Sequence, residues 1–157
     1  MQANSLHFSL PSAEETTFRA AELGGQLKIG DTVLLEGPVG AGKTHFARSL
    51  IQSLLIQYED VPSPTFTLVQ TYDTTSGPLW HSDLYRLTTS LDVAELGLPE
   101  AFGNAICLVE WPDRLGEMRP HDALEIALAP GATDDDRHLT ASWHAPRWTE
   151  RLAPWLT

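Results

Sequence analysis

The chain has 157 residues, a length that suits one domain with a substantial core, and it carries 10 basic against 21 acidic side chains. Its net charge of −11 repels phosphate backbones, which argues against direct, stable binding of nucleic acid. No apolar run reaches the roughly 18 residues of a membrane helix, no leader resembles a secretory signal, and Cys107 is the only cysteine. We therefore expect one domain over residues 1–157 in a reducing cytoplasm, without a membrane partner.

The first half of the sequence predicts strands and helices in alternation. Residues 6–10 alternate weakly, as in a short edge strand, and Ser12 lies three positions before Glu15, the spacing of a capping box on a helix that runs to Gly24. Residues 33–35 are continuously apolar, as in a strand buried on both faces. Apolar residues then recur at helical spacing from Lys43 to about Gln57.

The second half predicts two hairpins and another buried strand. Residues 65–72 and 79–84 form alternating or largely apolar strands around a turn, and a short helix follows through residue 96. Residues 105–109 are continuously apolar and are expected to pair beside residues 33–35. Residues 124–128 and 139–143 alternate around an exposed turn, and residues 146–155 have near-helical spacing.

The turn between the strand at 33–35 and the following helix fits the pattern G-x-x-x-x-G-K-[ST]. It consists of Gly37, Pro38, Val39, Gly40, Ala41, Gly42, Lys43 and Thr44. Glycines allow backbone N–H groups to converge on a phosphate, Lys43 can reach its β- and γ-phosphates, and Thr44 can offer a hydroxyl to Mg²⁺. A flexible glycine turn is the alternative, but the strand before it and the helix after it favour a phosphate-binding loop. The elements together predict a three-layer α/β fold like that of P-loop NTPases, with a mixed parallel and antiparallel sheet.

Two carboxylates and one hydroxyl could complete such a site. Glu110 follows the strand at 105–109, where it could hold Mg²⁺, directly or through water, or act as a base, unless it is a surface glutamate. Asp83 lies in a largely apolar strand and so needs a metal or a partner, the alternatives being a salt bridge to Arg86 or an exposed strand face. Thr65 lies where nucleotide switches often place a threonine. Whether Asp83 or Glu110 would be the base stays open.

The remaining residues favour ATP over GTP and leave three functions to weigh. No N-K-x-D tetrapeptide for guanine is present, so we expect an ATP hydrolase that needs Mg²⁺. A small-molecule kinase and a nucleotide-sensing module with negligible turnover are the alternatives, although the sequence has no arginine cluster for a kinase lid.

The six histidines lack metal-ligand spacing and are expected to be structural or surface residues. Trp111, in a loop after Glu110, is expected to be exposed and to contact a base or a partner.

Four segments of the chain resemble the TsaE family, formerly called YjeE, the small ATPases of bacterial tRNA threonylcarbamoyladenosine synthesis. They are residues 35–44, 63–69, 81–87 and 106–112, in the family's order and spacing. Asp-Leu-Tyr-Arg at 83–86 and Glu-Trp at 110–111 are more specific than the phosphate-binding loop. The resemblance covers most of the chain from about Pro11 to Arg137.

The resemblance implies roles that the residues alone only suggest. It implies that Thr44 and Glu110 lie at Mg²⁺, that Asp83 supports the metal and the attacking water, and that Thr65 is a switch residue. It implies nucleotide contacts from the segment Pro11 to Thr16, which includes Ala13, and from Arg137, and it implies that Trp111 lies close to the nucleotide or to the partner surface. It also implies a partner-dependent ATPase that acts with the proteins TsaB and TsaD and meets tRNA only through them.

Overall fold

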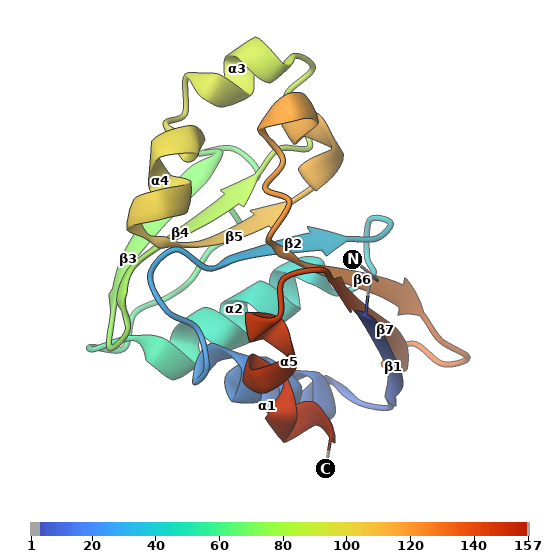
Figure 1. The fold of residues 1–157 in the computed structure, drawn as a ribbon. Coiled ribbons are helices and arrows are strands. Elements are labelled where there is room, and N and C mark those ends of the chain that lie inside the picture. Colours follow the sequence, from blue (N-terminus) through green and yellow to red (C-terminus); the bar gives the residue numbers. More distant parts are fainter. Residues whose placement is uncertain (1–3, 157) are drawn as a thin grey trace.

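All seven strands in residues 4–156, the part of the chain that this computed structural model describes, belong to one sheet (Figure 1). Their order across the sheet is β1-β7-β6-β2-β5-β4-β3. The strands are β1 (Asn4–Leu10), β2 (Thr32–Glu36), β3 (Val69–Thr74), β4 (Gly77–Asp83), β5 (Ile106–Glu110), β6 (Leu124–Pro130) and β7 (Arg137–Trp143).

The centre of the sheet is parallel and both flanks are antiparallel. β2 pairs in parallel with β5 and with β6, and β4 pairs in parallel with β5. The pairs β3–β4, β6–β7 and β1–β7 are antiparallel. This arrangement confirms the predicted mixed sheet, the edge strand and the pairing of the two continuously apolar strands.

Helices cover both faces of the sheet, because the central strands are apolar on both sides. In Figure 1, α1 (Ala13–Gly24), α2 (Lys43–Leu54) and α5 (Arg147–Arg151) lie below the sheet, and α3 (Ser90–Ala94) and α4 (Leu98–Asn104) lie above it. Val33 and Leu35 of β2 belong to the lower core, whereas Leu34 belongs to the upper core. None of the helices within residues 4–156 has the length and apolar character that a membrane crossing requires.

The first two helices begin where the sequence predicts, and the second ends early. The Ser12 hydroxyl accepts a hydrogen bond from the Glu15 amide at 3.1 Å, which confirms the predicted helix cap. The helix predicted to reach residue 57 ends at Leu54, because Leu55 is extended and forms a bridge with Thr74 beside β3. Pairing with the sheet edge thus overrides helical periodicity at this point.

The strand predicted over residues 65–72 is wrong in its first half. Residues 64–67 form a turn, and β3 begins only at Val69. Leu68 has a φ of 71°, its amide bonds to the Pro64 carbonyl, and Phe66 is 82% exposed. The apparent alternation of these residues therefore does not reflect a buried strand face, and the turn leaves Thr65 free to point into the site.

Four short helical segments were missed or merged in the sequence prediction. α4 was not predicted, and neither was the 3₁₀ helix η1 (Pro112–Met118) after β5. The single helix expected over residues 146–155 is divided into α5 and the 3₁₀ helix η2 (Ala153–Leu156). Pro154 accounts for the division, because a proline inside a helix removes a backbone donor and clashes with the preceding turn.

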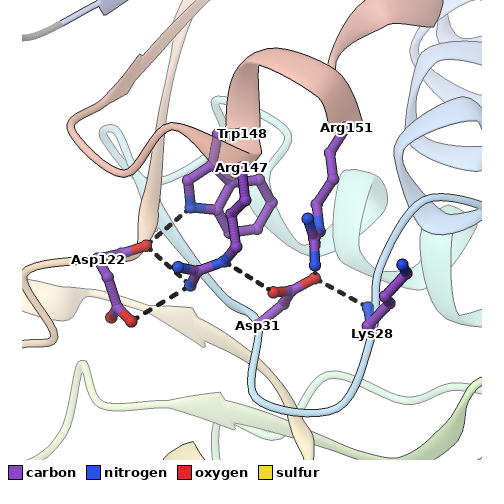
Figure 2. A network of polar contacts seen from close by, with 6 residues as sticks. All are labelled: Lys28, Asp31, Asp122, Arg147, Trp148 and Arg151. Atoms are coloured by element: carbon purple, nitrogen blue, oxygen red, sulfur yellow. Dashed lines mark hydrogen bonds and ion pairs between the residues drawn. The ribbon is translucent and has the colours of Figure 1, made fainter.

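A buried carboxylate ties α5 to the start of β2, as Figure 2 shows. Asp31 accepts hydrogen bonds from Arg147 Nε at 3.1 Å, from Arg151 Nε at 2.7 Å and from the Lys28 amide at 2.8 Å. Arg147 also reaches the carboxylate and carbonyl of Asp122, which precedes β6. These contacts hold the last helix of the chain at the edge of the sheet opposite the phosphate-binding loop.

We expect Asp31→Asn to lower the free energy of unfolding by about 2 kcal/mol, because two arginines lose the buried charge that they share. The partial exposure of both arginines keeps the loss below that of a fully buried pair. Urea denaturation with an unchanged slope measures the effect. Asp122→Asn removes an exposed carboxylate and should cost at most about 0.5 kcal/mol. Equal unfolding midpoints for the two variants would contradict the assignment.

Candidate nucleotide-binding site

The loop between β2 and α2 adopts a backbone that needs its glycines. Gly37, Gly40 and Gly42 have φ values of 141°, 83° and 101°, which side-chain-bearing residues rarely adopt. At Gly37 a Cβ atom would also collide with the carbonyl oxygen of Leu128 in β6. The loop is therefore pressed against β6, and its last residues open α2 with the helix N-terminus facing the site.

Lys43 is buried at 5% exposure and lies beneath an aromatic ring. Its ammonium donates to the carbonyls of Gly37 and Pro38, the latter at 3.1 Å, and lies 4.2 Å from the centre of the Trp111 ring. Burial lowers the pKa of Lys43, and the negative charges of Glu110 and Asp83 partly oppose this effect. Both carboxylates therefore act electrostatically on the same ammonium group.

Glu110 is the last residue of β5 and is 1% exposed, which removes the surface alternative. The sequence placed it just after the strand, whereas it belongs to the strand and pairs in register with Leu35 and Asp83. One carboxylate oxygen accepts from the Thr44 hydroxyl at 2.8 Å and the other from His81 Nε2 at 2.7 Å. The loop threonine and the acid at the strand end are thus in direct contact.

Asp83 ends β4 and is 5% exposed. Its carboxylate accepts from the Thr65 hydroxyl at 3.0 Å and from the Tyr85 amide at 2.9 Å. No ion pair between Asp83 and Arg86 is found among the described residues, and the Arg86 guanidinium lies 5.2 Å from the centre of the Phe66 ring. Asp83 is therefore buried and has a polar partner, as its place in a largely apolar strand predicts. That partner is Thr65, the predicted switch residue.

Trp111 lies at the site but is half-buried, so the expectation of an exposed ring is wrong. Its backbone has a φ of 59°, and its ring centre lies 4.8 Å from that of Tyr85. Contacts with Tyr85 and with the Lys43 ammonium account for the partial burial of the indole. The two aromatic rings form a wall next to the lysine.

Two cavities lie on either side of the loop. The larger, of about 400 Å³, is lined by Val39, Gly40, Gly42, Lys43, Thr44, His45, Thr65, Asp83, Tyr85, Glu110 and Trp111. The smaller, of about 110 Å³, is lined by Ala13, Thr16, Ala41, Gly42, His45, Leu128, Asp135 and Arg137. Arg137 also donates to the Gly40 carbonyl at 3.4 Å. Of the predicted site residues, only Gly37 and Pro38 line neither cavity, and both contribute carbonyls to Lys43.

The donor set in the larger cavity suits a magnesium nucleotide. Thr44, Glu110, Asp83 and Thr65 supply hydroxyl and carboxylate oxygens, the ligands that Mg²⁺ prefers. The ammonium of Lys43 and the N-terminus of α2 supply positive potential for phosphate groups. The residues therefore fit both groups, and their geometry permits phosphate binding beside a pair of buried acids.

Three residues of the site were not predicted from the sequence. His81 contacts Glu110, the Tyr85 ring contacts the Trp111 ring, and His45 lines both cavities. His81 had a detectable signal, because it lies two residues before Asp83 in a strand and so shares its face. Tyr85 also had a signal, because it belongs to the Asp-Leu-Tyr-Arg segment at 83–86, whereas His45 had none, because it follows the loop at a position where many side chains occur.

The strand, loop, helix and flanking sheet define an α/β protein of the P-loop NTPase-like class. The model of the family described as threonylcarbamoyl adenosine biosynthesis protein TsaE matches residues 10–139, and the chain belongs to this family.

Named relatives and a solved structure agree with the family match. A tRNA threonylcarbamoyladenosine biosynthesis protein TsaE from Rickettsia bellii (strain RML369-C) is 37% identical over 139 residues, which cover 88% of this chain and 95% of the relative. A protein of the same name from Bacillus subtilis (strain 168) is 40% identical over 128 residues, covering 81% and 78%. The crystal structure of Bacillus subtilis YdiB superposes with a TM-score of 0.79 at 30% identity, covering 98% of this chain and 95% of that one.

The buried position of Lys43 predicts a titration below the ordinary lysine pKa of 10.5. Lys28 and Lys43 are the only lysines in the sequence, so ¹³C-lysine labelling gives two side-chain signals, and Lys43→Arg identifies one of them. We expect the midpoint of the Lys43 signal to fall below 10.5. Between this midpoint and pH 10.5, Lys43 binds more protons in the unfolded chain than in the folded chain. The contribution of Lys43 to the free energy of unfolding therefore rises with pH over this range. A midpoint at or above 10.5 would contradict the burial.

Proposed function

We propose that the protein is a Mg²⁺-dependent ATPase that acts in threonylcarbamoyladenosine biosynthesis. One observation carries the proposal: the loop lysine and threonine converge with Glu110 and Asp83 on a single cavity. Glycine-rich loops with this lysine and this hydroxyl bind nucleotide phosphates, and strand-end acids beside them serve metal and water.

The two cavities divide the nucleotide between them. The loop, with Lys43, holds the phosphates in the larger cavity, since its backbone and ammonium supply the donors there. The smaller cavity, where Ala13, Thr16 and Arg137 lie, is the nucleoside side. ATP is favoured over GTP because the sequence lacks the guanine-binding tetrapeptide.

Thr44, Glu110 and Asp83 are the residues proposed to hold Mg²⁺. When bound, the ion neutralises negative charge on the β- and γ-phosphates. Glu110 contacts the Thr44 hydroxyl directly, so these two present oxygens to the same point at the end of β5. Asp83 lies in register beside Glu110 and shares its electrostatic influence on Lys43.

Asp83 and Thr65 are the pair proposed to orient the attacking water. Thr65 comes from the turn before β3 and meets the Asp83 carboxylate at 3.0 Å. A carboxylate can accept the proton of a water that is aligned with the γ-phosphate, and the threonine hydroxyl can fix its position. Because Glu110 contacts the loop threonine and Asp83 contacts Thr65, we assign Glu110 to the metal, and Asp83 to the water as well as to the metal.

The biological setting of the proposal comes from the relatives. Those of Rickettsia bellii and Bacillus subtilis are named as tRNA threonylcarbamoyladenosine biosynthesis proteins. The family resemblance further suggests TsaB and TsaD as partners whose complex the ATPase drives or resets. With a net charge of −11, the chain would meet tRNA only through those partners.

The proposal predicts Mg²⁺-dependent phosphate release from ATP that changes when TsaB and TsaD are added. Lys43→Ala and Glu110→Ala should each lower turnover by about a hundredfold or more, because each removes a charged group at the reacting phosphate. Glu95→Ala, which removes an exposed glutamate that lines neither cavity, should keep wild-type turnover.

Phosphate-release assays on the chain alone and with both partners measure these rates. ATP binding without turnover in either condition would favour a nucleotide-sensing module, and phosphate transfer to a metabolite would favour a small-molecule kinase. If TsaB and TsaD neither bind nor change turnover, the proposed setting is wrong.

A further inference from the structure

The carboxylate of Glu110 has a second partner that the proposed function does not use. His81 lies in β4, has no solvent exposure, and approaches Glu110 Oε2 with its Nε2 at 2.7 Å. Because an ionised carboxylate only accepts hydrogen bonds, Nε2 carries the proton and donates it. The other oxygen, Oε1, accepts from the Thr44 hydroxyl at 2.8 Å. Glu110 is therefore fixed at both oxygens, once by the phosphate-binding loop and once by His81.

The position of His81 follows from the sheet register. Across the parallel pair of β4 and β5, His81 is level with Leu108 and Asp83 is level with Glu110. His81 and Asp83 are two residues apart and project from the same face of β4. His81 thus contacts Glu110 from a position two residues before the end of β4, whereas Asp83 lies beside Glu110 at the cavity.

The contact with Glu110 is the one polar contact of the His81 ring within residues 4–156. Its Nδ1 is buried and has no hydrogen-bond partner there. An unpaired buried nitrogen is unfavourable, and an apolar side chain at this position would avoid that cost. The hydrogen bond to Glu110 is the contact of the His81 ring that an apolar side chain could not make, so it is the contact that explains this residue.

We propose that His81 is a positioning residue that holds Glu110 Oε2 and thereby keeps Oε1 directed at the Thr44 hydroxyl. The inference rests on the proposed function, because Thr44 and Glu110 are the residues assigned there to Mg²⁺. Residues that orient metal-binding side chains from behind typically change metal affinity by about 10- to 100-fold when they are replaced. Loss of the His81 donor should therefore weaken Mg²⁺-dependent binding of ATP and spare the contacts that Lys43 and the loop make without Mg²⁺.

A matched pair of amide substitutions tests this role. In His81→Gln the side-chain N–H group can occupy the position of Nε2, whereas in His81→Asn it lies near Nδ1 and is too far from Glu110. Calorimetric titration of ATP into each protein, at a series of Mg²⁺ concentrations and in excess EDTA, separates the two components of binding. Ser82→Ala is the control, because Ser82 is the next residue in β4, is fully buried and has an unpartnered hydroxyl within residues 4–156.

We expect His81→Asn to raise the half-saturating Mg²⁺ concentration about tenfold and to change ATP affinity in EDTA by less than about twofold. His81→Gln should restore the Mg²⁺ dependence to within about threefold of wild type, and Ser82→Ala should match wild type in both conditions. Equal Mg²⁺ dependence of His81→Asn and wild type would overturn the inference and leave the proposed function standing. Wild-type protein without Mg²⁺-dependent ATP binding would overturn both.

The wild-type protein gives a second measurement, in which a variant serves only to assign the signal. The ¹⁵N-labelled imidazole of His81 should show a proton on Nε2, with the signal assigned by its absence from His81→Gln. We expect this signal to shift when Mg²⁺ is added to the ATP complex, since Glu110 links it to the proposed metal position. A signal that does not respond to Mg²⁺, in protein that binds Mg²⁺ and ATP, would overturn the positioning role.

Discussion

Parallel pairing of β2 with β5, and of β5 with β4, is the constraint on which the candidate site depends. It places the carboxyl ends of three strands at one edge of the sheet, where the loop after β2 meets Glu110 and Asp83. The strands can pair in this way only because they are apolar on both faces and helices cover both. Burial of apolar side chains in the two cores, one on each face of the sheet, thus offsets the conformational entropy lost when the site is ordered.

The buried charges at this edge stabilise one another. Lys43, Glu110 and Asp83 are each at most 5% exposed, and an isolated ion at such a position would be strongly disfavoured. Two carbonyls and an indole ring surround the ammonium, while two hydroxyls, one imidazole and one amide donate to the carboxylates. A network satisfied in this way holds its side chains in fixed directions, which is what a phosphate-binding site requires.

The opposite edge of the sheet has a structural network instead. Asp31, at the start of β2, binds two arginines of α5, and these arginines lie beyond the residues that the family model matches. β2 is therefore anchored at both ends, by an ion pair with the last helix at one and by the loop at the other. The separation of the two networks allows α5 to contribute stability without touching the site.

The sequence by itself determined the local features of this protein. The loop from Gly37 to Thr44, the two continuously apolar strands and the hairpins follow from residue type and periodicity, which are properties of neighbouring residues along the chain. His81 could also have been identified, because it lies two residues before Asp83 in β4 and alternate residues of a strand share one face. Local pattern failed to predict the structure of residues 65–68, where alternation predicted a strand and the chain forms a turn.

Only the tertiary structure decided which of these residues meet. Thr44 and Glu110 are 66 positions apart and Thr65 and Asp83 are 18 apart, so their contacts depend on strand order and register rather than on local pattern. The half-buried place of Trp111 has the same origin, because its ring rests on Lys43 and Tyr85 from other segments. The sequence determined the groups that could bind a phosphate, and the parallel sheet decided that two buried acids and a histidine stand beside them, because register is fixed by packing across the whole core.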